Sequence, residues 1–100
     1  MDRSLSIRIQ PLAQQDIVSA YLWYENQRPG LGDDLLQRLD ECFADILRNP
    51  RGYQLVEGPI RRALPRRFPY AVYFVLTETE AVVIAVLHGR RNPAALLLRP

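Results

Sequence analysis

The sequence predicts an α+β fold in which a two-helix hairpin packs on one face of a mostly antiparallel sheet of three to five strands. Two observations lead to this class. Helical periodicity is confined to residues 12–48, and strand-like segments occupy the start and the second half of the chain. A chain of 100 residues without a linker or repeat is expected to form one domain over residues 1–100.

The first half begins with a short strand. Apolar and polar residues alternate over residues 5–10, and Pro11 ends this pattern. From residue 12 to about residue 27 the period becomes that of an amphipathic helix, which Arg28-Pro29-Gly30 breaks. Its apolar stripe consists of Ala13, Ile17, Ala20, Tyr21 and Tyr24. We expect Trp23 to join these residues in the core.

A second amphipathic helix follows the break. Asp33 and Asp34 fall in its first turn, where carboxylates favour the positive end of the helix dipole, and Asn49-Pro50 ends it. Cys42 lies on the apolar stripe, which predicts a buried and unreactive thiol. The stripe consists of Leu35, Leu39, Cys42, Phe43, Ile46 and Leu47. Two such helices joined by a short break predict a helical hairpin.

The second half has the composition of strands. Residues 72–76 are apolar on both faces, as expected of a strand covered on both sides. We predict strands over residues 53–56, 60–64, 67–76 and 81–87, with a hairpin turn at residues 77–80. The position of the first strand in this sheet is left open. The apolar tail, Leu96 to Leu98, is expected either to pack on the helices or to offer an edge to a partner.

The basic residues are unusual in kind and in position. All thirteen are arginines, so no lysine can serve as a base or form a Schiff base. Residues 1–50 hold five arginines and eight acids, a balance of −3, whereas residues 51–100 hold eight arginines and three acids, a balance of +5. The front half is therefore acidic and the back half basic.

Several classes of protein are excluded by composition. One cysteine cannot form an internal disulfide, and one cysteine with one histidine cannot build a structural zinc site. Neither a signal peptide nor an apolar run long enough to span a membrane is visible. We expect a cytoplasmic protein without a cofactor, a metal ion or a membrane partner.

An arginine cluster is the strongest candidate site. Pairing of the predicted strands brings six arginines towards one end of a hairpin: Arg61, Arg62, Arg66, Arg67, Arg90 and Arg91. Because guanidinium groups bind carboxylate or phosphate in pairs of hydrogen bonds, an anion-binding surface is favoured over a merely solvated basic edge. His88 lies beside the cluster and is either a packing residue or a general acid–base, with Glu57 or Tyr70 as its second group.

The chain resembles the RelE/ParE superfamily of toxins from type II toxin–antitoxin systems, and its ParE-like branch most closely. The resemblance runs over nearly the whole length and is carried by the following segments: Ala13 and Asp16, Tyr24-Glu25, Arg28 to Gly32, Asn49-Pro50, Ile60 to Ala63, Arg67 to Tyr70 and His88 to Pro93. It implies a compact α+β toxin that arrests growth, a role in plasmid stabilisation, and a cognate antitoxin that neutralises the toxin and supplies DNA binding to the complex.

The superfamily contains two activities, and the resemblance favours one of them. ParE-like members inhibit DNA gyrase without a known hydrolytic reaction, whereas RelE-like members cleave mRNA on the ribosome. The lysines on which many RelE-type sites depend are absent here. Gyrase inhibition by a non-enzymatic toxin is therefore the leading hypothesis, with the six arginines contacting target or antitoxin. The alternatives are an mRNA endoribonuclease using Glu57, Arg67 and His88, and a non-toxic relative that only binds its antitoxin.

Overall fold

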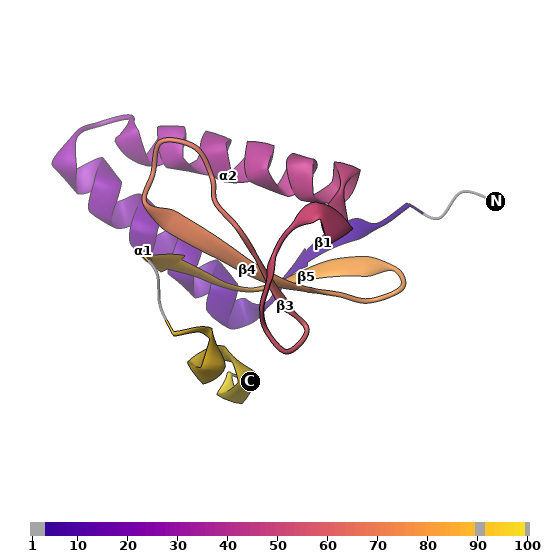
Figure 1. Ribbon diagram of the computed structural model, residues 1–100. Coiled ribbons are helices and arrows are strands. Elements are labelled where there is room, and N and C mark those ends of the chain that lie inside the picture. The colour runs from indigo at the N-terminus through magenta and orange to yellow at the C-terminus, as the bar shows by residue number, and fades with distance from the viewer. Residues whose placement is uncertain (1–3, 90–91, 100) are drawn as a thin grey trace.

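The structure is a computed structural model that describes residues 4–89 and 92–99. A sheet forms one layer, and a hairpin of two helices lies across one of its faces (Figure 1). The elements are β1 (Ser6–Ile9), α1 (Pro11–Gln27), α2 (Leu31–Arg48), the 3-10 turn η1 (Pro50–Gly52), β2 (Leu55–Glu57), β3 (Ile60–Ala63), β4 (Tyr70–Leu76), β5 (Glu80–His88) and the 3-10 segment η2 (Pro93–Leu98). This arrangement confirms the predicted α+β class.

The sheet has five strands in the order β1-β5-β4-β3-β2. β1 pairs in parallel with β5, with Ile7 opposite Ala81, and the other neighbouring strands are antiparallel. The helical hairpin between β1 and the later strands is long enough to serve as the crossover that a parallel pair requires. The sequence left the position of the first strand open, and the structure places this strand, β1, at the edge of the sheet and parallel to β5.

The two central strands, β4 and β5, are buried on both faces, as the sequence predicted. Val72, Tyr73 and Phe74 have no exposed surface, although they alternate between the faces. The helix-facing side includes Val72, Phe74, Ala81, Val83 and Val86, and the opposite side includes Ile60, Ala71, Tyr73 and Ala85. An extra residue in β5, between Val83 and Ala85, keeps the large side chains on the correct faces.

The C-terminal segment covers part of the second face. Leu96 of η2 is buried against that face, so the tail packs on the sheet and not on the helices, while Leu97 and Leu98 remain exposed. Arg99 then forms a two-pronged ion pair with Asp16 of α1, with N–O distances of 2.8 and 2.9 Å. Both side chains are mostly buried, so this pair ties the end of the chain to the first helix.

Three residues, Glu25, Gly30 and Gly32, stabilise the short turn between the helices. The Glu25 carboxylate of α1 accepts hydrogen bonds from the backbone N–H groups of Gly30 and Gly32, at distances of 2.8–3.1 Å, and so caps the start of α2. Gly30 has φ +89°, which favours glycine. A Cβ atom at Gly32 would come within 2.8 Å of Tyr21, so the two helices meet closely there.

Several strand boundaries differ from the predicted ones for local reasons. β4 begins at Tyr70 and not at residue 67, because Arg67 has φ +73°, outside the range of a strand. β2 spans residues 55–57 in place of 53–56. Tyr53, the first residue of the predicted strand, lies before β2. Its ring packs edge-on against that of Phe74, and the two ring centroids are 5.7 Å apart. Loop contacts thus shorten or shift the strands that they border.

Replacement of Glu25 by alanine tests the turn. Glu25→Ala leaves the first N–H groups of α2 without an acceptor, and we expect it to lower the free energy of unfolding by about 1–2 kcal/mol. Glu78→Ala, in the exposed β4–β5 turn, serves as the matched control and is expected to change it by less than about 0.5 kcal/mol. Equal urea midpoints for the two variants would contradict the capping role.

The alkylation rate of Cys42 tests its burial. The thiol is buried, as predicted, and burial raises its pKa from 9.0 to about 11. At pH 8 the folded chain should therefore react with iodoacetamide about a hundredfold more slowly than the chain unfolded in urea. The raised pKa also means that this thiol favours folding below about pH 9 and that its contribution is lost as the pH rises towards 11. Similar rates for the folded and unfolded chains would show that the thiol is accessible.

Candidate functional site

Arg61 and Arg62 of β3 lie on opposite faces of the sheet, as strand alternation predicts. Arg61 Nη1 donates to the carbonyl oxygens of Tyr53 at 2.7 Å and Arg51 at 3.3 Å. Arg62 Nη2 donates to the side-chain oxygen of Gln54 at 3.5 Å. Both guanidinium groups therefore contact the segment before β2, and that of Arg61 supports the backbone there.

Arg66 and Arg67 occupy the connection between β3 and β4 and are both exposed. The Arg67 guanidinium lies over the ring of Phe68, 6.0 Å from its centroid, within the range of a cation–π contact. The remaining members of the predicted cluster, Arg90 and Arg91, lie outside the described residues. The four described arginines thus form two pairs, one bound to a neighbouring segment and one open to solvent.

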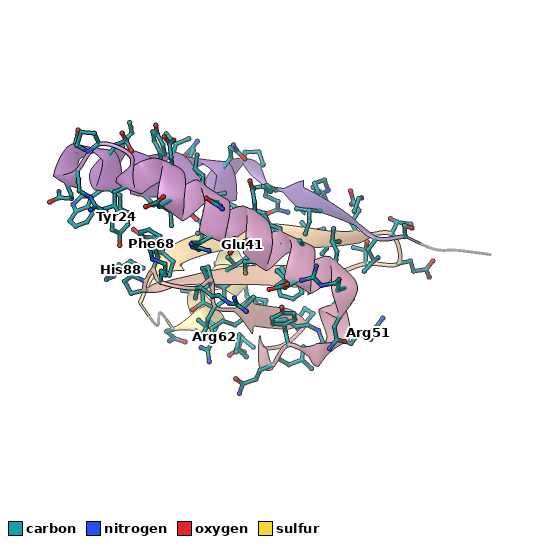
Figure 2. All side chains as sticks on the ribbon, turned by 90° about the horizontal axis from the view of Figure 1, so that it is seen from above. Tyr24, Glu41, Arg51, Arg62, Phe68 and His88 are labelled. Carbon is teal, nitrogen blue, oxygen red and sulfur yellow. The ribbon has the colours of Figure 1, made fainter. Side chains whose placement is uncertain are left out.

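A cluster of aromatic rings occupies the end of the sheet where β4 begins and β5 ends. We call it the aromatic cluster, and its members are Trp23, Tyr24, Phe68, Tyr70 and His88. Tyr24, near the end of α1, packs edge-on against Trp23, Phe68 and Tyr70 at centroid distances of 4.9, 5.0 and 6.1 Å. Tyr70 in turn packs edge-on against His88 at 5.3 Å. Figure 2 shows Tyr24, Phe68 and His88 together at this end, far from Arg51.

Part of the aromatic cluster faces solvent. Trp23 is 57% exposed, so the prediction that it belongs to the core was wrong, and His88 is exposed as well. Two shallow hollows of about 280 and 350 Å³ are both lined by Trp23, Tyr70 and His88. Exposed tryptophan side chains beside such hollows are common at protein–protein interfaces.

The tyrosines of the cluster keep their protons at neutral pH. Burial raises the pKa of Tyr24, and burial together with the charge of Tyr24 raises the pKa of Tyr70. Both phenols can therefore donate a hydrogen bond at that pH.

Glu57 lies at the other end of the sheet from the aromatic cluster. It pairs with Ile60, which faces Val75 of β4, whereas His88 faces Tyr70. Five residues along β4 separate these positions, or about 17 Å of strand. A series of contacts through Phe68, Tyr24 and Tyr70 links Arg67 to His88. Glu57 is not part of this series. The structure therefore does not bring together the predicted set of Glu57, Arg67 and His88.

Sequence reasoning missed the exposed side of α1. Val18 and Leu22 are about half exposed and lie four residues apart, directly before Trp23. This spacing forms a second apolar stripe on the helix, away from the stripe that faces the sheet. Trp23 follows Leu22 by one residue and lies about 100° further around the helix, so this pair gives no signal that Trp23 is exposed.

Residues 4–89 and 92–99 contain no group of three or more His, Cys, Asp or Glu side chains that could hold a metal ion. No helix in this part of the chain is both long and apolar enough to cross a membrane.

A β-strand, a helical hairpin and a mostly antiparallel sheet that ends in exposed rings and arginines place the chain in a class of small α+β domains. The sequence model of one family in this class, described as the ParE toxin of type II toxin-antitoxin system, parDE, matches residues 7–93. Because the match spans most of the chain, the protein belongs to the ParE toxin family.

Comparison with solved structures gives the same fold. A chain from a structure titled "Chromosomal ParDE TA system from P. aeruginosa" superposes with a TM-score of 0.78 and 14% sequence identity, covering 89% of this chain and 100% of that one. A comparison with curated proteins gives no match. At this identity the structural likeness establishes the fold alone.

Substitutions in β3 test which of its two arginines supports the fold. Arg61→Met removes hydrogen bonds to two carbonyl groups, and we expect it to lower the free energy of unfolding by about 1–2 kcal/mol. Arg62→Met removes one long contact to an exposed side chain and should cost less than about 0.5 kcal/mol. Chemical denaturation measures both, and equal losses would contradict a structural role special to Arg61.

Proposed function

We propose that this ParE-family toxin arrests growth by binding and inhibiting DNA gyrase, and that a cognate antitoxin neutralises it. Membership of the ParE family is the observation that carries the proposal. The toxin acts in the cytoplasm, where its target is, and DNA binding by the complex comes from the antitoxin. Such a pair can stabilise the plasmid or other replicon that encodes it.

The exposed aromatic cluster is the surface through which we propose that the toxin contacts its target. Tryptophan, tyrosine and arginine dominate the energetics of protein interfaces, and Trp23, Tyr70 and Arg67 supply all three within one chain of contacts. Rigid edge-on packing orders these rings before binding, which lowers the entropic cost of association. The arginines of the predicted cluster contribute to contacts with target or antitoxin.

The mRNA endoribonuclease is the alternative, with Arg67 and His88 as its candidate residues. Arg67 could stabilise phosphate charge and His88 could transfer a proton. Their proposed partner Glu57 belongs to the opposite end of the sheet, and burial raises the pKa of Tyr70, which keeps its phenol protonated at neutral pH. The separation of Glu57 and the lack of lysine favour inhibition by binding over hydrolysis.

A supercoiling assay with purified gyrase tests the proposal. We expect the purified toxin to block supercoiling of relaxed plasmid, and addition of the co-purified antitoxin to restore it. Supercoiling that continues at a large molar excess of toxin would overturn the proposal. Cleavage of mRNA in a translation extract would then support the ribonuclease, and growth without arrest or cleavage would support the non-toxic relative.

Substitution of Trp23 tests the proposed contact surface. Because hot-spot truncations commonly cost about 2 kcal/mol or more, we expect Trp23→Ala to weaken gyrase inhibition at least tenfold with an unchanged melting temperature. Leu97→Ala is the matched control, since Leu97 is 52% exposed at a different part of the surface. Equal inhibition by both variants would remove the aromatic cluster from the interface.

A further inference from the structure

A groove separate from the aromatic cluster lies between α2 and the connection from β3 to β4. This connection rises beside α2 (Figure 1). The groove has a volume of about 360 Å³, and residues that line it include Arg38, Glu41, Asp45, Arg48, Leu64 and Arg66. We propose that it binds an acidic peptide segment of a partner protein, with one carboxylate held by Arg38 and Arg66 and an adjacent apolar side chain on Leu64.

The two carboxylates of the groove are already paired along α2. Arg38 Nη1 donates to both oxygens of Glu41, at 2.9 and 3.1 Å, and Arg48 is bound to Asp45. Each pair is formed by residues three apart on the helix, so the four charges cancel. Arg66, on the opposite wall, adds a positive charge that these pairs do not offset. The groove as a whole is therefore suited to an anion.

Arg38 also has a hydrogen-bond donor to spare. Its Nε atom is buried and makes no hydrogen bond, although the Nη1 atom of the same group is bound to Glu41. A buried N–H without an acceptor is costly, and a carboxylate oxygen in the groove would remove that cost. Burial raises the pKa of Tyr53, another lining residue, so its phenol stays protonated and can also donate.

The apolar part of the groove is suited to an apolar side chain of the peptide that lies next to the peptide's carboxylate. Leu64 is 57% exposed, which is high for a large apolar residue, and it is followed by the buried Pro65. A peptide that places a leucine or valine next to a glutamate would cover Leu64 while its carboxylate reaches Arg66. Such a peptide thus uses both kinds of surface in the groove.

This composition favours an acidic peptide over a nucleic acid. A phosphate backbone carries closely spaced negative charges, whereas Arg66 is the lining charge that the ion pairs along α2 do not offset. A single side-chain carboxylate would contact Arg66 and the Nε–H group of Arg38, which the ion pairs along α2 leave available. If the toxin acts as proposed, the acidic segment belongs to the antitoxin, so this assignment of the partner rests on the proposed function.

A titration followed by NMR tests the groove without any assumption about the toxin's target. The probe is an acetylated, amidated peptide of alternating leucine and glutamate, added to the ¹⁵N-labelled full chain. We expect shifts concentrated in residues 38–48 and 64–66 and in the Arg38 Nε–H signal. Arg66→Glu and Arg38→Met, checked for folding by circular dichroism, should each weaken binding at least tenfold, as should a peptide with glutamine in place of glutamate.

Arg28→Glu is the charge-matched control, because Arg28 is exposed in the turn between α1 and α2 and does not line the groove. Binding weakened equally by Arg28→Glu and Arg66→Glu would overturn the proposal, since only net charge would then matter. Shifts confined to other surfaces, or tighter binding of a single-stranded RNA than of the peptide in this groove, would overturn it too.

A second arm tests whether the acidic segment is the antitoxin's. Co-purification of the co-expressed antitoxin should be weakened at least tenfold by Arg66→Glu and not by Arg28→Glu. Undiminished antitoxin binding by Arg66→Glu would overturn that assignment. Loss of growth arrest in the wild-type chain would instead count against the proposed function, and the peptide titration would still decide the groove.

Discussion

Burial of β4 and β5 on both faces is the constraint on which the rest of the structure depends. Large side chains such as Tyr73 and Phe74 point to opposite sides and are both fully buried, so each face of the sheet needs its own cover. The helical hairpin covers one face, and the C-terminal segment contributes Leu96 to the other. The Asp16–Arg99 ion pair joins the two covers, and Asp16 also accepts a hydrogen bond from the β5 backbone at Val86.

The same constraint sets where recognition can occur. Because the central strands are enclosed along their length, side chains from them reach solvent mainly where the strands end. Tyr70 and His88 pair across one such end and are met there by Tyr24 from α1 and Phe68 from the preceding loop. The contact surface proposed for the target is thus a consequence of the way in which the core is closed. The groove beside Arg66 is separate, which leaves room for target and antitoxin to use different surfaces.

Much of the fold could be predicted because it depends on local periodicity. The period of α2, the two-sided apolar run at residues 72–76 and the breaks at Gly30 and Pro50 each specify their elements. The parallel place of β1 and the cover of the second face depend on contacts between distant residues, such as Ile7 with Ala81, and could not be read locally.

For the site, hairpin pairing read from the sequence brings Tyr70 and His88 together, and the same up-and-down order of strands puts the turn at Glu57 at the opposite end of the sheet. The exposure of Trp23 could not be read in this way, because it depends on how α1 lies on the sheet.

The central claim is that this toxin acts through contacts made by its exposed aromatic cluster. The most direct measurement is photo-crosslinking in growing cells, with a photoreactive phenylalanine analogue in place of Trp23. The account predicts a crosslink to a gyrase subunit, and none from the same analogue at position 97. A crosslink from position 23 to ribosomal protein or RNA, with none to gyrase, would contradict it.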